Sequence, residues 1–497
     1  MSGSRHRTLL RQRYRAIVAY TGLVLLIAAG LILSTLLVVP FYPGEARQAP
    51  AFLIPGGMVA VAGALLWHWF RPRGGATLTW QEGAVVVVLA WAGSILAAAA
   101  VFMLAQGLTF TQAVFEATSG WTTTGLSVVD VTATSHVVLL FRSNLELAGG
   151  AGLAIIMLSA LVGPAGAGLS SAEGRSDQLA PHVRRSAGIV LALYSAYAVG
   201  GTLALRLAGM RWFDAVNHSF AAVSTGGFST RPESIGYWNS PAIEAVTIVL
   251  MLLGTLNFLT SWALARGKLR AFLKNGEVRL LAVLLLAGAV VVFSSVAGSL
   301  YASLGKAARV AFFEVASAAS TTGFSTVGYL QWGPLPVFVL IGLMIVGGGT
   351  GSTAGGLKQY RVYVLFRALW WELQRGVSPA TTVSTHAVWV GEERRFVDDR
   401  QIRSAAVFVF VYMVAFGVGS GILMGYGYGM RESLFEFASA LGTVGLSVGV
   451  TAPDAPAGVL WTETAGMLLG RLEFFTVIVG VMRLATDGLA ASDRTGE

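Results

Sequence analysis

The chain has 497 residues, of which 55% are hydrophobic and only 12% are charged, and its mean hydropathy is +0.68. Soluble domains carry about 25% charged residues, so this composition excludes an ordinary soluble protein. The absence of cysteine excludes disulfides, thiolate metal sites and a cysteine nucleophile. The net charge is +9, and the basic residues responsible for it lie mostly between alternate apolar segments. This placement indicates a membrane protein and no nucleic-acid partner.

The first apolar run, about 16–41, follows a basic head, as the apolar region of a signal peptide does. That region has about 7–15 residues in signal peptides, so the longer run predicts a retained transmembrane helix. Hydropathy, with breaks at charge clusters, proline and glycine, predicts ten membrane-crossing helices in all. Their approximate spans are 16–41, 51–70, 81–105, 136–162, 187–208, 240–264, 278–300, 334–357, 402–425 and 458–482.

Lysine and arginine cluster between alternate spans, and the positive-inside rule assigns such segments to the cytoplasm. An even number of spans then leaves both termini in the cytoplasm. The segments assigned to this side carry Arg71, Arg73, Arg175, Arg184, Arg185, Arg266, Lys268, Arg270, Lys274, Arg279, Lys358, Arg361, Arg367, Arg375, Arg394, Arg395, Arg400 and Arg403.

The eight spans after the first two form four pairs, and a shorter apolar stretch lies between the members of each pair. Each stretch ends in Thr-x-Gly-(Leu/Phe)-Ser, and the motif glycines are 102, 96 and 122 residues apart. This is an internal repeat of helix, re-entrant segment and helix. The predicted filter residues are Thr123, Thr124, Gly125, Leu126, Thr225, Gly226, Gly227, Phe228, Thr321, Thr322, Gly323, Phe324, Thr443, Val444, Gly445 and Leu446.

The similarity of the copies extends upstream, where three of them share Phe and Glu ten and nine residues before the glycine and a serine six before it. The second copy differs, with Asn217, His218 and Ala221 at these positions. The predicted ring of four copies is therefore unequal around its axis.

Four non-helical segments inside a bilayer require a shared wet cavity, because bare backbone in hydrocarbon is costly. Rings of backbone carbonyls replace the hydration shell of potassium, and glycine permits the backbone turn that aligns them. Each short helix before a motif would point its negative C-terminal end at the cation. Close packing of small residues is the alternative for one copy, but not for four at equivalent places. We expect potassium at Thr123, Gly125, Thr225, Gly227, Thr321, Gly323, Thr443 and Gly445.

A glycine-rich run lies where the eighth span should cross the inner leaflet, and so much glycine should break the helix. A broken helix below a filter indicates a gate, and the alternative is a close-packed small-residue helix. A phosphate-binding loop is excluded, because no strand precedes the run and its spacing is wrong. The predicted gate residues are Gly347, Gly348, Gly349, Thr350, Gly351, Ser352, Thr353, Ala354, Gly355, Gly356 and Lys358, together with Arg471 in the last span.

Intramembrane arginine is costly and usually faces a cavity or a partner. We interpret Arg471 as a cationic barrier in the pore, and an ion pair with another helix is the alternative. Glu473, two residues on, does not share its helix face. Arg142 and Glu146 in the fourth span are four residues apart and can pair with each other.

These features resemble the Trk/Ktr/HKT superfamily of potassium transporters, and the TrkH-type branch most of all, over nearly the whole chain. The filter motifs, the glycine-rich run with Lys358, and Gly470-Arg471-Leu-Glu473 carry the resemblance, as do Ser234-Ile-Gly-Tyr237 and Ser240-Pro-Ala-Ile243. Sodium-favouring plant relatives have serine at the first filter glycine, so Gly125 resembles the potassium-conducting pattern. One departure is Glu146-Leu147, where the family usually has Gln-Trp.

The resemblance implies potassium uptake across the cytoplasmic inner membrane through a single-chain filter, without enzymatic activity or an organic cofactor. It also implies a gating loop opposed by Arg471, a homodimer, and a cytosolic nucleotide-binding regulatory ring of the TrkA type. Whether flux is channel-like or coupled to sodium or protons stays open.

The expected fold is an all-α polytopic membrane protein, with four pseudo-symmetric helix–pore-loop–helix repeats around one central pore and two extra N-terminal transmembrane helices. The expected division is 1–80 for the basic N-terminus and extra helices, 81–175, 176–275 and 276–375 for repeats one to three, 376–397 for a cytoplasmic linker, and 398–497 for repeat four and the tail.

Two other classes of function compete with this interpretation. A secondary transporter for an organic solute also uses broken helices, but such sites usually come from two repeats. An intramembrane enzyme would need convergent acids, bases or metal ligands, and the six histidines are scattered without a His-Glu-x-x-His motif.

Overall fold

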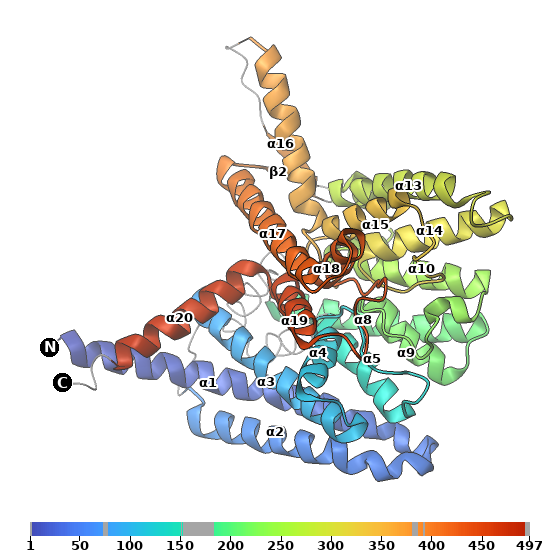
Figure 1. Cartoon of the computed structure of the whole chain (residues 1–497). Helices are drawn as coiled ribbons and strands as arrows, with labels where there is room; N and C mark the ends of the chain where they lie inside the picture. The colour runs from blue at the N-terminus through green and yellow to red at the C-terminus, as the bar shows by residue number, and fades with distance from the viewer. Residues whose placement is uncertain are drawn as a thin grey trace.

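A computed structural model describes residues 2–72, 78–150, 152, 183–379, 386–390 and 393–492 of the chain. Nearly all of the described elements are helices (Figure 1). Within these ranges, six helices are long and apolar enough to cross a membrane, and two bent helix pairs can each form a further span. The predicted all-α polytopic fold is confirmed.

The two N-terminal helices, α1 (Ser2–Ser34) and α2 (Ala49–Phe70), pack side by side along one flank of the bundle (Figure 1). Two 3₁₀ helices, η1 (Thr35–Phe41) and η2 (Pro43–Gln48), connect them. Gly22 and Gly63 bring the two backbones close together, since a Cβ on Gly22 would lie 2.8 Å from the Gly63 carbonyl oxygen. Small residues at a helix crossing permit this approach.

The rest of the chain repeats a three-part unit four times. The first helices of the units are α3 (Trp80–Gln106), α8 (Val183–Leu207), α13 (Gly276–Val296) and α17 (Asp399–Gly425). The short re-entrant helices are α4 (Phe110–Trp121), α9 (Trp212–Val223), α14 (Leu304–Ser320) and α18 (Met430–Gly442). The closing helices are α5 (His136–Gly150), α10 (Pro241–Thr255) with α11 (Phe258–Ala265), α15 (Pro334–Val346), and α19 (Ala457–Leu472) with α20 (Phe474–Ser492).

The re-entrant helices have between 12 and 17 residues, too few to cross a bilayer. Each packs against the first helix of its own unit. Their own sequences specify where they begin, as in α4, where Thr109 and Gln112 form a capping box. Two smaller helices lie between units or after a filter, η5 (Ser234–Tyr237) and α12 (Leu269–Lys274).

Three of the predicted spans are broken in the structure, and two of these breaks were not predicted. The span 240–264 bends by 118° between α10 and α11, and the span 458–482 bends by 102° between α19 and α20. At the first bend, the Gly254 and Thr255 carbonyls accept hydrogen bonds from Thr353 and Gly349 at 3.2 and 3.0 Å. In a continuous helix these carbonyls would accept from amides four residues further along. Here they accept from another segment instead, and the helix ends.

The third break is the predicted one, because α15 ends at Val346 and the glycine-rich run after it is not helical. The predicted fourth span, 136–162, is described only through Gly150 and at Gly152. Arg73, Arg175 and parts of the predicted linker also lie outside the described residues.

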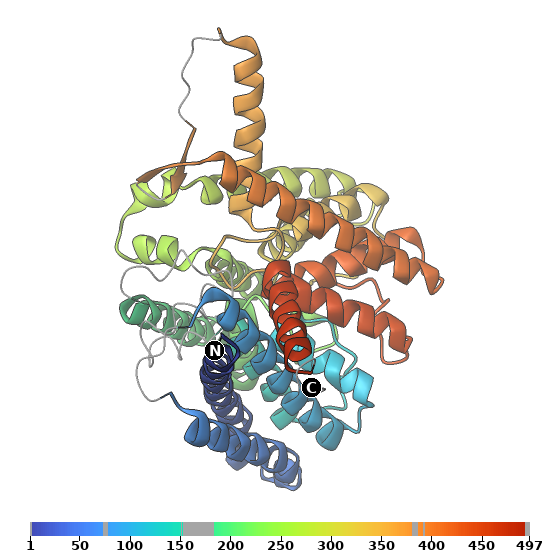
Figure 2. The same cartoon turned by 90° about the vertical axis from the view of Figure 1, so that its left-hand side faces the viewer.

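After the glycine-rich run, α16 (Gln359–Val377) projects from the bundle (Figures 1 and 2). The predicted linker contains an antiparallel hairpin of β1 (Ala387–Val390) and β2 (Glu393–Phe396), with Val388 opposite Arg395. Val388 is buried and packs against α16 in a small apolar cluster that includes Trp371. This hairpin was not predicted, because strands of four residues among charged residues are too short to show an alternating apolar pattern.

Candidate functional site

All four re-entrant helices end in the same backbone geometry. The threonine of each motif has a positive φ, 55° at Thr123, 54° at Thr225, 54° at Thr321 and 49° at Thr443. The amide of the next residue bonds back to a carbonyl in the helix, as Thr124 does to Ser119 at 2.9 Å. This is a Schellman ending with threonine where glycine is usual. A non-glycine residue in this region costs about 1–3 kcal/mol and persists only where the surroundings enforce it.

The four motif glycines form a closed ring. Each has a φ between 81° and 98°, and a Cβ on each would strike the carbonyl oxygen that precedes the glycine of the next copy. These would-be contacts are Gly125 to Gly226 at 2.2 Å, Gly227 to Thr322 at 2.1 Å, Gly323 to Val444 at 1.9 Å and Gly445 to Thr124 at 2.1 Å. The order one, two, three, four, one means that the four segments surround a single axis.

The fourth motif position is apolar in every copy and is buried in the protein. Leu126, Phe228, Phe324 and Leu446 are all buried in the described structure, with at most 2% of each side chain exposed. Each belongs to one of the four filter segments, which are defined here as 123–127, 225–229, 321–325 and 443–447. The oxygens of the backbone and of threonine therefore supply the polar surface of the ring.

Three copies share a glutamate on the re-entrant helix, and this glutamate accepts a hydrogen bond from the backbone just after the filter segment of the same copy. Glu116 accepts from the Val128 amide at 3.0 Å, Glu314 from the Thr326 amide at 2.8 Å and Glu436 from the Val448 amide at 2.9 Å. In the second copy His218 takes this place, and its Nε2 lies 2.9 Å from the Ser229 hydroxyl. The imidazole thus replaces the carboxylate within the same arrangement.

A cavity of about 640 Å³ opens on one side of the ring. All four motif glycines line it, together with Asp130 on the same side. We call this cavity the outer vestibule, since Asp130 lies in the connection between the third and fourth predicted spans, which the positive-inside rule assigns to the outer side. A hydrated cation has room to reach the ring from here.

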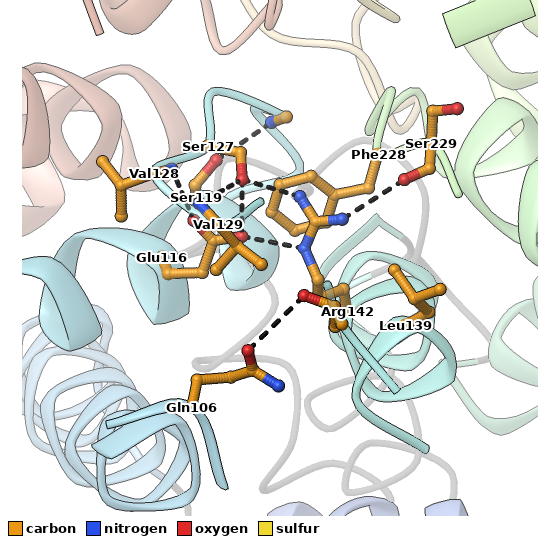
Figure 3. Close-up of polar contacts among 12 residues, drawn as sticks. Gln106, Glu116, Ser119, Ser127, Val128, Val129, Leu139, Arg142, Phe228 and Ser229 are labelled. Atoms are coloured by element: carbon orange, nitrogen blue, oxygen red, sulfur yellow. Dashed lines mark hydrogen bonds and ion pairs between the residues drawn. The ribbon is translucent and has the colours of Figure 1, made fainter. Parts of the chain in front are cut away.

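Arg142 joins the first two filter segments at the vestibule (Figure 3). Its Nε donates to Glu116 at 2.8 Å, and its terminal nitrogens donate to the Ser127 hydroxyl at 2.8 Å and the Ser229 carbonyl at 3.3 Å. The guanidinium carbon lies 3.8 Å from the centre of the Phe228 ring. The expected pairing of Arg142 with Glu146 is therefore wrong, because a tertiary partner on α4 replaces the local one.

We expect Glu116→Ala to lower the free energy of unfolding by about 3–5 kcal/mol, since it leaves a buried arginine without its ion-pair partner. Arg142 and Glu116 are 2% and 0% exposed. Thermal melting of the detergent-solubilised chain measures the effect. The matched control is Glu372→Ala on α16, whose ion pair with Arg375 is exposed and which should melt close to wild type.

The glycine-rich run, residues 347–356, lies directly against the ring and is called the inner loop here. The Gly355 amide donates to the Thr321 hydroxyl at 2.8 Å, and the Thr353 hydroxyl lies 3.2 Å from the Thr225 hydroxyl. A Cβ on Gly355 would lie 2.1 Å from the Thr443 hydroxyl oxygen. The loop therefore contacts the threonines of three filter segments.

Arg471 holds the inner loop to the first repeat. Its terminal nitrogens donate to the Thr353 carbonyl at 2.6 Å, to the Gly150 carbonyl at 2.6 Å and also to the Gly149 carbonyl. The Lys358 ammonium donates to the Ala354 carbonyl within the loop region. The predicted gate residues are thus in contact with one another, although sequence alone did not predict that Arg471 binds backbone carbonyls.

The space beside this contact is small. It measures about 20 Å³ and is lined by Arg471, Lys358 and loop residues of the described chain. About one water molecule fits in such a volume. The filter glycines line the wide outer vestibule, whereas the inner loop and Arg471 line this narrow space.

Glu473 adds a contact at the bend between α19 and α20. It has a φ of 59° and pairs with Arg361 of α16 at 2.8 Å. The spacing of Glu473 from Arg471 does not identify Arg361 as its partner, because Arg361 lies on a distant helix. The bend thereby joins the last repeat to the projecting helix.

Comparison with known proteins gives one consistent family. The profile of TrkH, described as a cation transport protein, matches residues 48–488. The Trk system potassium uptake protein TrkH of Salmonella typhimurium is 31% identical over 487 residues, covering 94% of this chain and 98% of that protein. TrkG of Escherichia coli, named a Trk system potassium uptake protein, is 31% identical and covers 83% and 87%.

A crystal structure, that of the potassium transporter TrkH from Vibrio parahaemolyticus, superposes with a TM-score of 0.81 at 28% identity. It covers 94% of this chain and 98% of that one. The fold, the repeats and the family profile agree, and the family is one of transporters rather than enzymes. The chain belongs to the TrkH family of cation transport proteins, as a multi-pass membrane protein.

Proposed function

We propose that this chain mediates potassium uptake through the ring of four filter segments. The observation that carries the proposal is the closed order of contacts, in which each motif glycine abuts a carbonyl of the next copy. Four such segments around one axis supply the rings of oxygen that replace the hydration shell of potassium. The names of the relatives, Trk system potassium uptake proteins, agree with this ion.

Threonine hydroxyls are the proposed further ligands. Among the described residues, the buried hydroxyls of Thr123 and Thr443 have no hydrogen-bond partner, so their oxygens are available to a cation. The C-terminal ends of the re-entrant helices add negative potential, each worth a few tenths to about 1 kcal/mol. The ion is thus stabilised without a carboxylate in the ring, at Thr123, Gly125 and their counterparts in the other copies.

The inner loop with Lys358 and Arg471 is the proposed gate. Its contacts with three filter threonines and its attachment to Arg471 support this role, since the loop has to leave before an ion can pass. The bond between Arg361 and Glu473 gives a route by which a cytosolic partner on α16 acts on this region. The proposed partner is a nucleotide-binding ring of the TrkA type.

The remaining assignments follow from topology and family. We infer a homodimer in the cytoplasmic membrane with both termini inside, in keeping with the basic segments between alternate spans. The proposed functional division keeps two extra helices in 1–80 and four pore repeats from residue 81 onward, interrupted by the linker at 376–397.

Flux measurements in proteoliposomes test the proposed function. Potassium and rubidium should enter faster than sodium and lithium through the wild-type chain. Gly125→Ser should lower the potassium-to-sodium ratio, because a side chain at φ 90° meets the Gly226 carbonyl and displaces it. A wild-type chain without potassium preference, or an unchanged ratio in Gly125→Ser, contradicts the proposal. Competition by an organic solute would instead favour a secondary transporter.

A further inference from the structure

The second filter segment lacks a support that two other copies have. The Gly125 amide donates to the Ser119 hydroxyl at 3.1 Å, and the Gly445 amide donates to Ser439 at 2.9 Å. Ala221 stands at the equivalent place in the second copy and has no hydroxyl to offer. The Gly227 amide therefore lacks the serine acceptor that Gly125 and Gly445 have.

Glu146 of α5, in the neighbouring repeat, supplies an acceptor one residue further along the second filter segment. Its Oε1 accepts a hydrogen bond from the Phe228 amide at 2.9 Å, and its side chain is fully buried. A Cβ on Gly226 would lie 2.4 Å from the carboxyl carbon of Glu146. The carboxyl group thus lies directly against the backbone of the second filter segment.

This contact fixes the direction of a filter carbonyl. The amide of Phe228 and the carbonyl of Gly227 belong to one planar peptide unit and point in opposite directions. When Glu146 holds the amide, the Gly227 carbonyl is directed away from Glu146, and rotation of the peptide would break the hydrogen bond. Gly227 is one of the four ring glycines, so the orientation of this carbonyl is part of the ring.

Arg142, four residues earlier on the same helix, is not the partner that holds Glu146 in place. Arg142 is committed to Glu116, Ser127 and Ser229. In the described part of the chain, Oε2 of Glu146 has no hydrogen-bond partner, so its bond to Phe228 is the polar contact that determines its position.

We propose that Glu146 is a positioning residue for cation selectivity, which orients the Gly227 carbonyl by accepting the Phe228 amide hydrogen. The proposal rests on the proposed function of the ring as a potassium filter. The position of the acceptor oxygen, and not the charge of the carboxylate, is what supports selectivity.

Two variants of Glu146 separate the effect of side-chain length from the effect of side-chain charge. Glu146→Gln keeps an acceptor oxygen at the same distance and removes the charge, whereas Glu146→Asp keeps the charge and shortens the side chain by one methylene group. We expect Glu146→Asp to lower the potassium-to-sodium flux ratio by about tenfold, the effect of one lost hydrogen bond of moderate strength. Glu146→Gln should stay within about twofold of wild type, because its carbonyl oxygen replaces Oε1.

The measurement uses the full chain in proteoliposomes, after size-exclusion chromatography has shown that each variant is monodisperse. Glu244→Asp is the matched control, since it shortens a buried glutamate that pairs with Arg309 at 2.9 Å and is not in the filter. Its flux ratio should equal that of wild type. A melting temperature for each variant separates a loss of stability from a loss of selectivity.

The results distinguish this proposal from the proposed function. A wild-type chain without potassium preference would refute the filter itself. With a selective wild type, an unchanged ratio in Glu146→Asp would overturn the positioning role. A loss of selectivity in Glu146→Gln equal to that in Glu146→Asp would also overturn it, because charge would then be the cause. If Glu146→Asp does not fold, Glu146→Leu, which has no acceptor oxygen, takes its place: a lowered ratio beside an unchanged ratio in Glu146→Gln supports the proposal, and an unchanged ratio refutes it.

Discussion

Replacing Gly323 by alanine is expected to reduce potassium flux by about a hundredfold in a correctly folded chain. Gly323 has a φ of 81°, and a Cβ there would lie 1.9 Å from the Val444 carbonyl oxygen. Real Cβ contacts essentially never fall below 3.0 Å, so this oxygen has to retreat by about 1 Å. An oxygen that no longer reaches the cation loses about 2–3 kcal/mol of charge-assisted interaction.

The matched control is Gly333→Ala, ten residues further along the chain. Gly333 has a φ of −67°, and a Cβ there would meet nothing within 4 Å. Rubidium uptake into proteoliposomes at equal protein density measures both variants, and the control should conduct as the wild type does. Equal flux in Gly323→Ala and wild type would mean that the ring of glycines is not the ion path.

The ring was predictable from sequence because its signal is repeated four times. A single Thr-x-Gly copy is ambiguous, but four copies between paired apolar helices require four equivalent backbone segments. The sequence also predicted that the helix before Gly347 would end. The order of contacts around the axis, and the positive φ of Thr123 and its counterparts, were not predictable, since threonine rarely adopts this conformation.

The features that could not be predicted from the sequence depend on contacts with segments far away in the chain. Hydropathy alone shows 240–264 as one span, but the inner loop takes the carbonyls of Gly254 and Thr255 and α10 ends there. The spacing of Arg142 and Glu146 along one helix suggests an ion pair between them, whereas in the structure Arg142 forms its ion pair with Glu116. Sequence spacing describes neighbours within one helix, and the inner loop and the filter are assembled from different repeats.

The inner loop also changes the interpretation of Arg471. A bare positive charge in the path would act by repulsion alone, worth about 3 kcal/mol for an ion about 6 Å away at an effective dielectric constant of about 20. In the structure the guanidinium also donates to carbonyls of the loop and of the first repeat, at Thr353 and Gly150. The proposed role of Arg471 in the gate therefore has two parts, an electrostatic barrier and the hydrogen bonds that hold the inner loop in place.

We accordingly expect Arg471→Ala to raise potassium flux at least about tenfold, because it removes the repulsion and releases the inner loop together. Arg471→Lys keeps the charge but loses the planar fork of donors that reaches two segments at once. It should raise flux by a smaller factor, and the difference between the two variants measures the contribution of charge. Potassium flux in proteoliposomes, without any added partner, provides the comparison.

Arg483→Ala is the control for removing an arginine from the last helices. Arg483 pairs with Asp487 within α20 at 3.1 Å, with 35% of its side chain exposed, and its loss should leave flux unchanged. Unchanged or lower flux from monodisperse Arg471→Ala protein would contradict the gating role. If Arg471→Lys instead matches Arg471→Ala, the fastening of Thr353 to Gly150 is what closes the path, and the charge contributes little.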